Sequence, residues 1–294
     1  MLKDNKEFLK RNLLFDGAMG TELQRRGLPI GIPPELWNME NPNIVEEIHR
    51  DYISSGAMVI ETNTFGGNRL RLKRKDLEGK VKEINKRAVE IALKFKSKGI
   101  LIAGSVGPLG ELIEPYGDIT EEEAEEIFSE QIEILRDSGV DFILIETMIS
   151  LDEAKIALRS AKRLGCIVGV TMSFEWGAKG GRTPFGDEVE ISMRELEKEG
   201  VDFVGANCGK GIEDMRKIAP ILRKSTNLPI LIQPNAGMPQ IINRKLVYSE
   251  SPSNFAIFVE EMLDLGVNFI GGCCGTNPEF IKEAYKVFKE KSRI

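Results

Sequence analysis

Residues 140–154 of the chain are VDFILIETMISLDEA, and this stretch contains the unit that predicts the fold. The apolar run Val140–Ile145 indicates a buried strand, which ends at the polar pair Glu146–Thr147. Ser150 and Glu153 have the spacing of a capping box, which predicts the start of a helix. A buried strand followed by a helix is the building block of a parallel α/β sheet.

The same unit recurs along the whole chain. The predicted strands cover residues 12–15, 57–62, 100–105, 140–145, 166–172, 201–206, 228–233 and 267–270. Each is followed by a predicted helix, and eight such units predict a single (β/α)8 barrel over residues 1–294, with residues 1–11 as a short charged, helical lead-in. The alternative is an open, doubly wound sheet. No Gly-x-Gly-x-x-Gly turn follows the first strand, and no change in composition marks a second domain.

Composition and charge exclude several classes of protein. The net charge is −6 and the charges are interspersed, which argues against the basic surface of a nucleic-acid-binding protein. No apolar run reaches the roughly 18 residues of a membrane span. The first seven residues are mostly charged or polar and lack the apolar segment of a signal peptide. These features predict a cytoplasmic protein without a membrane partner.

Polar residues collect at the predicted carboxyl ends of the strands, where barrels of this type have their active sites. Three of the four cysteines are among them. The residues singled out at these ends are Asp16, Glu61, Asn63, Glu146, Cys208, Asn235, Cys273 and Cys274.

The adjacent cysteines in residues 271–276, GGCCGT, pose a geometric question. Neighbouring side chains of a strand point to opposite faces, so both thiols can reach one point only if the backbone leaves the strand, which the glycines allow. In a closed barrel Cys208 lies two strands from Cys273 and Cys274, within plausible reach. Three thiolates suit Zn²⁺ and leave a fourth position open, as in catalytic sites. The alternatives are three free buried cysteines, or a strained disulfide between the adjacent pair.

Two further residues are interpreted as structural. Cys166 opens a strand at the opposite end of the barrel and is expected in the core. His49, the only histidine, lies in a predicted helix as a surface or packing residue. Histidine-based general base catalysis and a Ser-His-Asp triad are therefore not expected.

Six motifs, in order along residues 12–288, resemble those of the homocysteine S-methyltransferase domain family, and within it most closely the homocysteine domain of cobalamin-dependent methionine synthases. They are DGAMGT (16–21), ETNTF (61–65), Gly107–Pro108, Glu146–Thr147, NCG (207–209) and GGCCGT (271–276). The resemblance implies a (β/α)8 barrel and a methyltransferase that binds one zinc per chain through Cys208, Cys273 and Cys274.

The resemblance also implies how the substrate is held. Asp16 and Glu146 match the family carboxylates that bind the amine of homocysteine. The turn at Gly17 and Ala18 can offer backbone N–H groups to the substrate carboxylate, and Asn63 and Asn235 are candidate lining residues. The zinc would stabilise the homocysteine thiolate, which attacks a methyl carbon and gives methionine.

The expected methyl donor is a methylcorrinoid, methylcobalamin, carried on another domain or chain with corrinoid- and folate-binding modules. The barrel uses the whole length of the chain, so these modules would belong to a longer enzyme or to separate polypeptides. The alternatives are a stand-alone enzyme that uses S-methylmethionine or betaine, and a non-catalytic zinc or sulfur-amino-acid binding protein.

Overall fold

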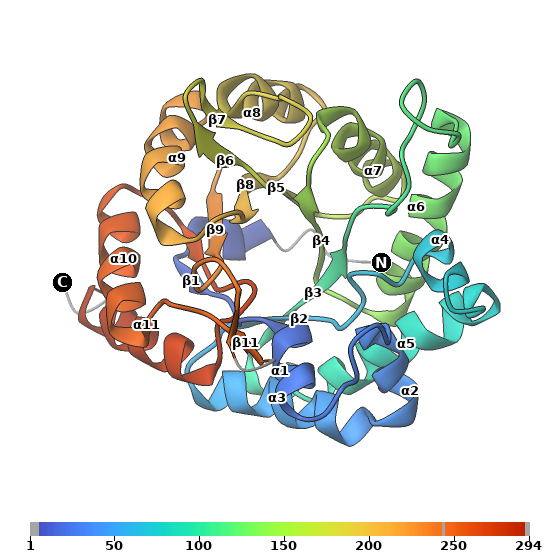
Figure 1. Ribbon diagram of the computed structural model, residues 1–294, viewed down its shortest axis with the longest axis horizontal. Coiled ribbons are helices and arrows are strands. Elements are labelled where there is room, and N and C mark those ends of the chain that lie inside the picture. Colours follow the sequence, from blue (N-terminus) through green and yellow to red (C-terminus); the bar gives the residue numbers. More distant parts are fainter. Residues whose placement is uncertain (1–5, 243–244, 292–294) are drawn as a thin grey trace.

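Eight parallel strands form the centre of the molecule, and a ring of helices surrounds them (Figure 1). The structure is a computed structural model that describes residues 6–242 and 245–291. The strands are β1 (Leu13–Leu14), β2 (Val59–Glu61), β3 (Leu101–Val106), β4 (Phe142–Met148), β5 (Val168–Met172), β8 (Phe203–Cys208), β9 (Ile230–Pro234) and β12 (Phe269–Ile270).

The sheet closes into a barrel. Its strand order is β1-β12-β9-β8-β5-β4-β3-β2, so each strand is paired with its neighbours in sequence around the ring. Phe15 and Val59 form a parallel bridge between the two outermost strands, and the Met58 N–H donates to the Leu14 carbonyl at 2.7 Å. The predicted (β/α)8 barrel is confirmed, and the open doubly wound sheet is excluded.

The eight predicted strands all coincide with a strand of the barrel, and a long helix follows each of them before the next begins. These helices are α3 (Pro42–Ser54), α5 (Val81–Leu93), α6 (Glu121–Ser138), α7 (Leu151–Arg163), α8 (Val189–Lys198), α9 (Ile212–Ser225), α10 (Pro252–Asp264) and α11 (Pro278–Lys291). The predicted cap of α7 is present, since Ser150 accepts the Glu153 N–H at 3.4 Å. Thr120 caps α6 in the same way and accepts the Glu123 N–H at 3.1 Å.

Short elements in the connections are the main difference from the sequence-based expectation. The small residues of 16–21 predict a turn and the prolines of 27–41 predict an irregular loop, but helical segments begin in both. Their helical periodicity is too short to detect, and packing decides the outcome, as for the buried Trp37. These elements are α1 (Met19–Arg25), η2 (Pro34–Leu36), α2 (Trp37–Glu40), α4 (Arg69–Lys73), η3 (Glu78–Lys80), η4 (Lys96–Lys98) and the hairpins β6–β7 (Glu175–Gly177, Gly180–Arg182) and β10–β11 (Gln240–Ile242, Lys245–Val247).

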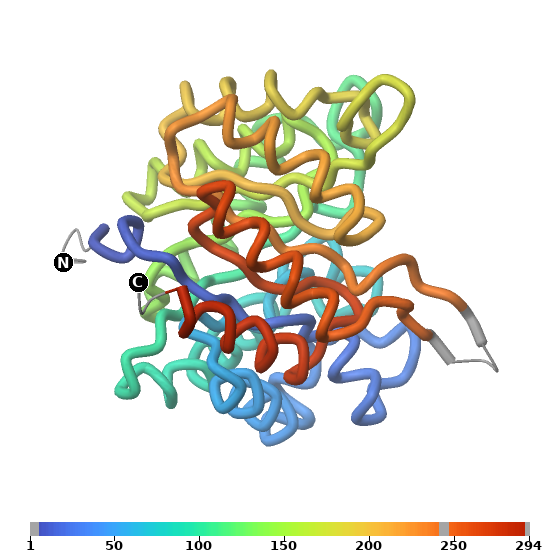
Figure 2. The backbone as a smooth tube through the Cα atoms, turned by 90° about the vertical axis from the view of Figure 1, so that its left-hand side faces the viewer, coloured from blue at the N-terminus to red at the C-terminus, as the bar shows by residue number. Residues whose placement is uncertain are grey.

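Aromatic side chains fill the barrel interior. Phe142 and Phe203 meet there with ring centroids 5.6 Å apart, and Phe203 lies 5.2 Å from Phe269. The predicted lead-in forms a 3-10 helix, η1 (Lys6–Lys10), whose Phe8 stacks on Phe142 at 5.0 Å. The segment η1 thus covers one end of the barrel, and the hairpin β10–β11 projects from the molecule on the opposite side (Figure 2).

Within residues 6–242 and 245–291, no helix combines the length and the apolar character that a membrane crossing requires.

Candidate active site

Three thiols meet at the carboxyl ends of two barrel strands. Cys208 is the last residue of β8, and Cys273 and Cys274 follow β12. Their sulfur atoms all lie within 4.8 Å of one another, and among the described residues no other group of three or more His, Cys, Asp or Glu side chains has this geometry. Strands β8 and β12 both flank β9, which places the thiols two strands apart as predicted.

The backbone at Cys208 adopts a conformation that non-glycine residues rarely take. Its φ is 65°, and Gly209 follows with a φ of 64°. The left-handed turn ends strand β8 and directs the Cys208 sulfur toward the other two. Strain of this kind is concentrated at functional sites.

The two adjacent cysteines leave the strand on a loop that neighbouring backbones hold. The Cys273 N–H donates to the Pro234 carbonyl at 2.9 Å, and the Ala236 N–H donates to the Cys274 carbonyl at 2.9 Å. A Cβ on Gly272 would lie 2.4 Å from the Thr276 hydroxyl oxygen, so this position has no room for a side chain. The glycine therefore allows the tight turn that directs both thiols to one point, as the sequence predicts.

The charge distribution among the thiols suits a cation. The Cys273 and Cys274 thiols hydrogen-bond to Cys208, which lowers the pKa of Cys208 to about 3, so it is a thiolate at neutral pH. The same contact raises the pKa of Cys274 to about 12. Asn235 donates its Nδ2 to the Cys208 sulfur at 3.5 Å, and its buried Oδ1 has no partner. The three convergent sulfurs form a donor set that can hold a metal ion.

A cavity of about 610 Å³ opens onto the thiols. Its walls come from the carboxyl ends of most of the barrel strands and from the loop after β1. Asp16, Glu61 and Glu146 line it together with the three cysteines. The cavity therefore brings together the carboxylates and the thiols that were predicted to share one end of the barrel.

A local irregularity of β4 directs Glu146 into this cavity. The register of β4 against β5 shifts between Ile145 and Met148, and Thr147 has a φ of 59°. The side chain of Asn207 secures this conformation, because it accepts the Thr147 N–H at 2.8 Å and donates to the Thr147 hydroxyl at 2.7 Å.

The three carboxylates have hydrogen-bond donors but no cation. Ser105 donates its hydroxyl to Glu146 at 2.5 Å, Gln233 donates Nε2 to Glu61 at 2.6 Å, and the Glu61 N–H donates to Asp16 Oδ2 at 3.1 Å. Within the described part of the chain, no Lys or Arg forms an ion pair with any of the three.

Burial penalises the charged form of each of these carboxylates. It raises the pKa of Glu146, and it raises the pKa of Asp16 and of Glu61 well above their usual values. Asp16 Oδ1 is buried and has no partner. The cavity therefore has an excess of acceptors, which fits a ligand that brings positive charge and N–H donors.

Three of the other four residues that were predicted to bind substrate line the cavity, and the fourth lies beside the thiols. Gly17, Ala18 and Asn63 line the cavity, whereas Asn235 lies beside Cys208. The Ala18 N–H already donates to Thr276 at 3.1 Å, and the Asn63 side chain donates to the Pro34 carbonyl at 2.8 Å.

Sequence reasoning missed two residues that support the site, Ser105 and Gln233. Both were placed at strand ends, and this position was the only signal available. Their partners are 41 and 172 positions away in the sequence, so only the closed barrel reveals the contacts.

The residues interpreted as structural are buried. Cys166 is 7% exposed at the end of the barrel opposite to the thiols. His49 is fully buried in α3, and its ring lies 6.4 Å from that of Phe95, so the packing interpretation holds and the surface one does not.

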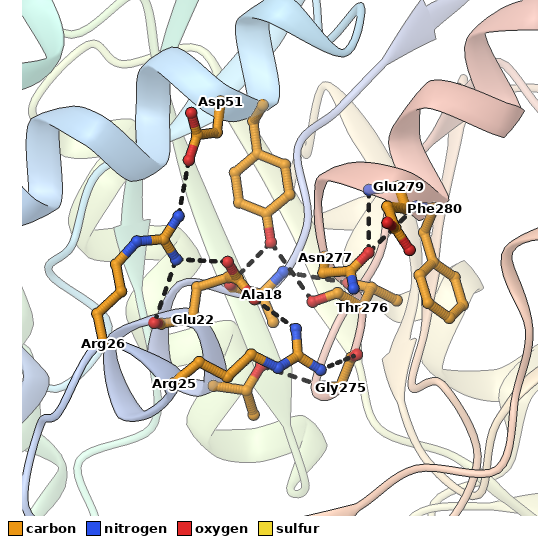
Figure 3. Close-up of polar contacts among 12 residues, drawn as sticks. Ala18, Glu22, Arg25, Arg26, Asp51, Gly275, Thr276, Asn277, Glu279 and Phe280 are labelled. Carbon is orange, nitrogen blue, oxygen red and sulfur yellow. Dashed lines mark hydrogen bonds and ion pairs between the residues drawn. The ribbon is translucent and has the colours of Figure 1, made fainter.

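A hydrogen-bond network connects the cysteine loop to the turn after β1 (Figure 3). Thr276 accepts the Ala18 N–H at 3.1 Å. It also donates its hydroxyl to the Cys273 carbonyl at 2.8 Å. Arg25 donates to the Gly275 carbonyl at 3.1 Å, and Glu22 binds both Arg25 and Arg26. The network ties together the two segments that form adjacent walls of the cavity.

The family model described as homocysteine S-methyltransferase matches residues 13–288. The chain belongs to this family. It is a family of methyltransferase enzymes, which agrees with the resemblance seen in the six motifs.

Curated relatives include two methionine synthases. The protein from Mycobacterium leprae is 30% identical over 295 positions, and that from Mycobacterium tuberculosis is 29% identical over the same length. In both cases the alignment covers 93% of this chain and 24% of the relative. The chain therefore spans about a quarter of the length of these relatives.

Solved structures support the fold. The metallated form of the homocysteine methyltransferase MmuM from Escherichia coli superposes with a TM-score of 0.79 at 24% identity, covering 94% of this chain and 96% of that one. The carboxyl transferase domain of Rhizobium etli pyruvate carboxylase superposes with a TM-score of 0.54 at 11% identity, covering 96% of this chain and 48% of that one. Because the sequence identities are this low, the superpositions show that the chains share the barrel fold, and they show nothing about activity.

Proposed function

We propose that this chain transfers a methyl group to the thiol of L-homocysteine and so forms L-methionine, with one zinc ion held by Cys208, Cys273 and Cys274. One observation carries the proposal: three convergent thiols share a cavity with the carboxyl groups of Asp16, Glu61 and Glu146, with which no Lys or Arg of the described residues forms an ion pair. This arrangement suits a ligand with a sulfur at one end and an ammonium group at the other. Membership of the homocysteine S-methyltransferase family supports the same substrate.

The bound zinc would supply one chemical effect, the stabilisation of the substrate sulfur as a thiolate near neutral pH. With that effect in place no general base is required of the protein. This agrees with the position of His49, the only histidine of the chain, which is buried in α3.

The residues of the chain would bind and orient the amino-acid end of homocysteine. Asp16 and Glu146 accept hydrogen bonds from the ammonium group, and the unpaired Asp16 Oδ1 is available for this contact. The turn at Gly17 and Ala18 would lie beside the substrate carboxylate, although the Ala18 N–H itself donates to Thr276, and Asn63 completes the wall. Because these groups are buried, their hydrogen bonds to a charged ligand are stronger than in water.

The donor that we propose is a methylcorrinoid, methylcobalamin, carried on another domain or subunit that also has a folate-binding module. The methionine synthase relatives support this choice. The alternative is S-methylmethionine or betaine as a free donor, supported by the superposition on the MmuM chain over 96% of its length. A zinc protein without catalytic activity is the remaining alternative.

The donor assay separates these possibilities. Purified, zinc-loaded protein is incubated with homocysteine and methylcobalamin, S-methylmethionine or betaine, and methionine is measured. We expect methionine from methylcobalamin alone. Methionine from only one of the other donors would assign the chain to another branch of the family, and no methionine from any donor would refute the methyltransferase proposal.

Substitutions of single cysteines test the metal site. Cys208→Ser is expected to lose zinc and activity, because two thiols and a hydroxyl bind zinc far more weakly. Cys166→Ser is the matched control, since this cysteine is buried at the opposite end of the barrel. Zinc retained in full by Cys208→Ser would refute the proposed ligand set.

A further inference from the structure

Glu61 is a half-buried carboxyl group of the cavity to which the proposed function assigns no task. It is the last residue of β2, and it reaches across the barrel to Gln233 of β9, whose Nε2 donates to Glu61 Oε1 at 2.6 Å. Its carboxyl group is also hydrogen-bonded to the carboxyl group of Glu146. Asp16 lies on its other side and accepts the Glu61 N–H at 3.1 Å.

A hydrogen bond between two carboxyl groups requires one proton between them, because two carboxylates offer only acceptors. The neighbouring donors indicate which group carries that proton. Glu146 accepts the Ser105 hydroxyl at 2.5 Å and the Asn207 side-chain amide at 3.4 Å. Glu61 accepts a single side-chain donor, Gln233. Because Glu146 receives more hydrogen-bond donors, it is the anion, and Glu61 is the neutral donor.

The surroundings of Glu61 favour the same assignment. The pKa of Glu61 is raised well above its usual value, mainly because the group is buried and, to a smaller extent, because Glu146 and Asp16 are negatively charged. No Lys or Arg within the described residues forms an ion pair with these three groups. One ammonium group balances one carboxylate, so a third full negative charge next to Asp16 and Glu146 would add a further uncompensated charge when the ligand binds.

We propose that Glu61 is a positioning residue for the substrate ammonium group: it donates a hydrogen bond to Glu146 and fixes the orientation in which Glu146 receives that group. The inference rests on the proposed function, since it takes homocysteine as the ligand. Glu61 then acts through the length and donor capacity of its side chain, and its negative charge is not required.

Two substitutions separate these properties. Glu61→Gln keeps the length, and the new amide can donate to Glu146 while its oxygen still accepts from Gln233. Glu61→Asp keeps the carboxyl group but is one methylene shorter, so it withdraws from Glu146. Both variants are conservative in volume and are first checked for zinc content and thermal unfolding.

The affinity of the zinc-loaded protein is measured by calorimetry for homocysteine and for 4-mercaptobutanoate, which has the same thiol and carboxylate but no amine. For homocysteine, Glu61→Gln is expected to remain within about threefold of the wild type, and Glu61→Asp to lose about tenfold or more, as for a lost hydrogen bond to a charged group. For 4-mercaptobutanoate, neither variant should differ from the wild type by more than about twofold.

Three results would overturn the inference. A homocysteine affinity that falls in Glu61→Gln but is kept in Glu61→Asp would show that the charge matters. Unchanged affinity in both variants would remove Glu61 from the ammonium site. An equal loss for both ligands would indicate a general structural role. If the wild type binds neither thiol, the proposed function itself fails. This result is distinct from a failure of the Glu61 inference, because it is seen in the wild type alone.

Discussion

Replacement of Thr276 by valine tests whether the cysteine loop depends on its connection to the turn after β1. Thr276 is fully buried, and its hydroxyl accepts the Ala18 N–H at 3.1 Å and donates to the Cys273 carbonyl at 2.8 Å. Valine has nearly the same shape but makes neither bond, so the buried Ala18 N–H is left without a partner.

The magnitude follows from these two contacts. An unpaired buried N–H costs about 1–3 kcal/mol. Loss of the second bond costs less, about 0.5–1.5 kcal/mol, because the Cys273 carbonyl still accepts the Thr276 N–H at 3.1 Å. The free energy of unfolding should therefore fall by about 1.5–4.5 kcal/mol in Thr276→Val.

The assay is urea unfolding of both variants at one pH, with zinc content measured on the same samples. Thr276→Ser is the matched control, since it keeps the hydroxyl and loses one methyl group, at a cost of about 1 kcal/mol. Thr276→Val should be the less stable of the two and should also retain zinc less well. If the valine variant is as stable as the serine variant and holds as much zinc, the hydroxyl does not support the loop.

Two further predictions concern the scaffold. Burial lowers the pKa of His49 to about 4 from its usual 6.5, so the unfolded chain binds the additional proton as the pH falls. Between pH 7 and pH 5, protonation of His49 in the unfolded chain should lower the free energy of unfolding by about 2 kcal/mol. The variant His49→Leu should lack this contribution to the pH dependence. An equal fall in the free energy of unfolding in both proteins would contradict the lowered pKa of His49. Gly205→Ala would place a Cβ 1.9 Å from the Leu231 carbonyl oxygen and should lower the free energy of unfolding, measured in urea, by about 3 kcal/mol or more. Gly79→Ala is the control, because its Cβ would have nothing within 4 Å, and it should change the free energy of unfolding by less than about 1 kcal/mol. Equal effects of the two alanines would refute the packing argument.

The barrel was predictable because each strand is an apolar run followed by a helix. Strand ends in a parallel barrel share one face, so the sequence also predicted that Cys208, Cys273 and Cys274 lie near Asp16 and Glu146. These inferences need only the order of the elements along the chain.

The contacts within the site could not be predicted in the same way. The bond between Gln233 and Glu61 crosses the barrel between residues 172 positions apart, and it depends on which side chains point inward. The left-handed backbone of Thr147 has no signature in the sequence either, because a β-branched residue rarely adopts it. Tertiary contacts, here those of Asn207, determine this conformation.

The central claim is that the three cysteines hold a zinc ion on which homocysteine binding depends. The most direct test is calorimetry with homocysteine on the zinc-loaded protein, on the same protein after zinc removal by a chelator, and after zinc has been restored. We predict about one zinc per chain, homocysteine binding in the loaded protein, its loss on zinc removal and its return with zinc. Homocysteine binding of equal affinity without zinc would contradict the account.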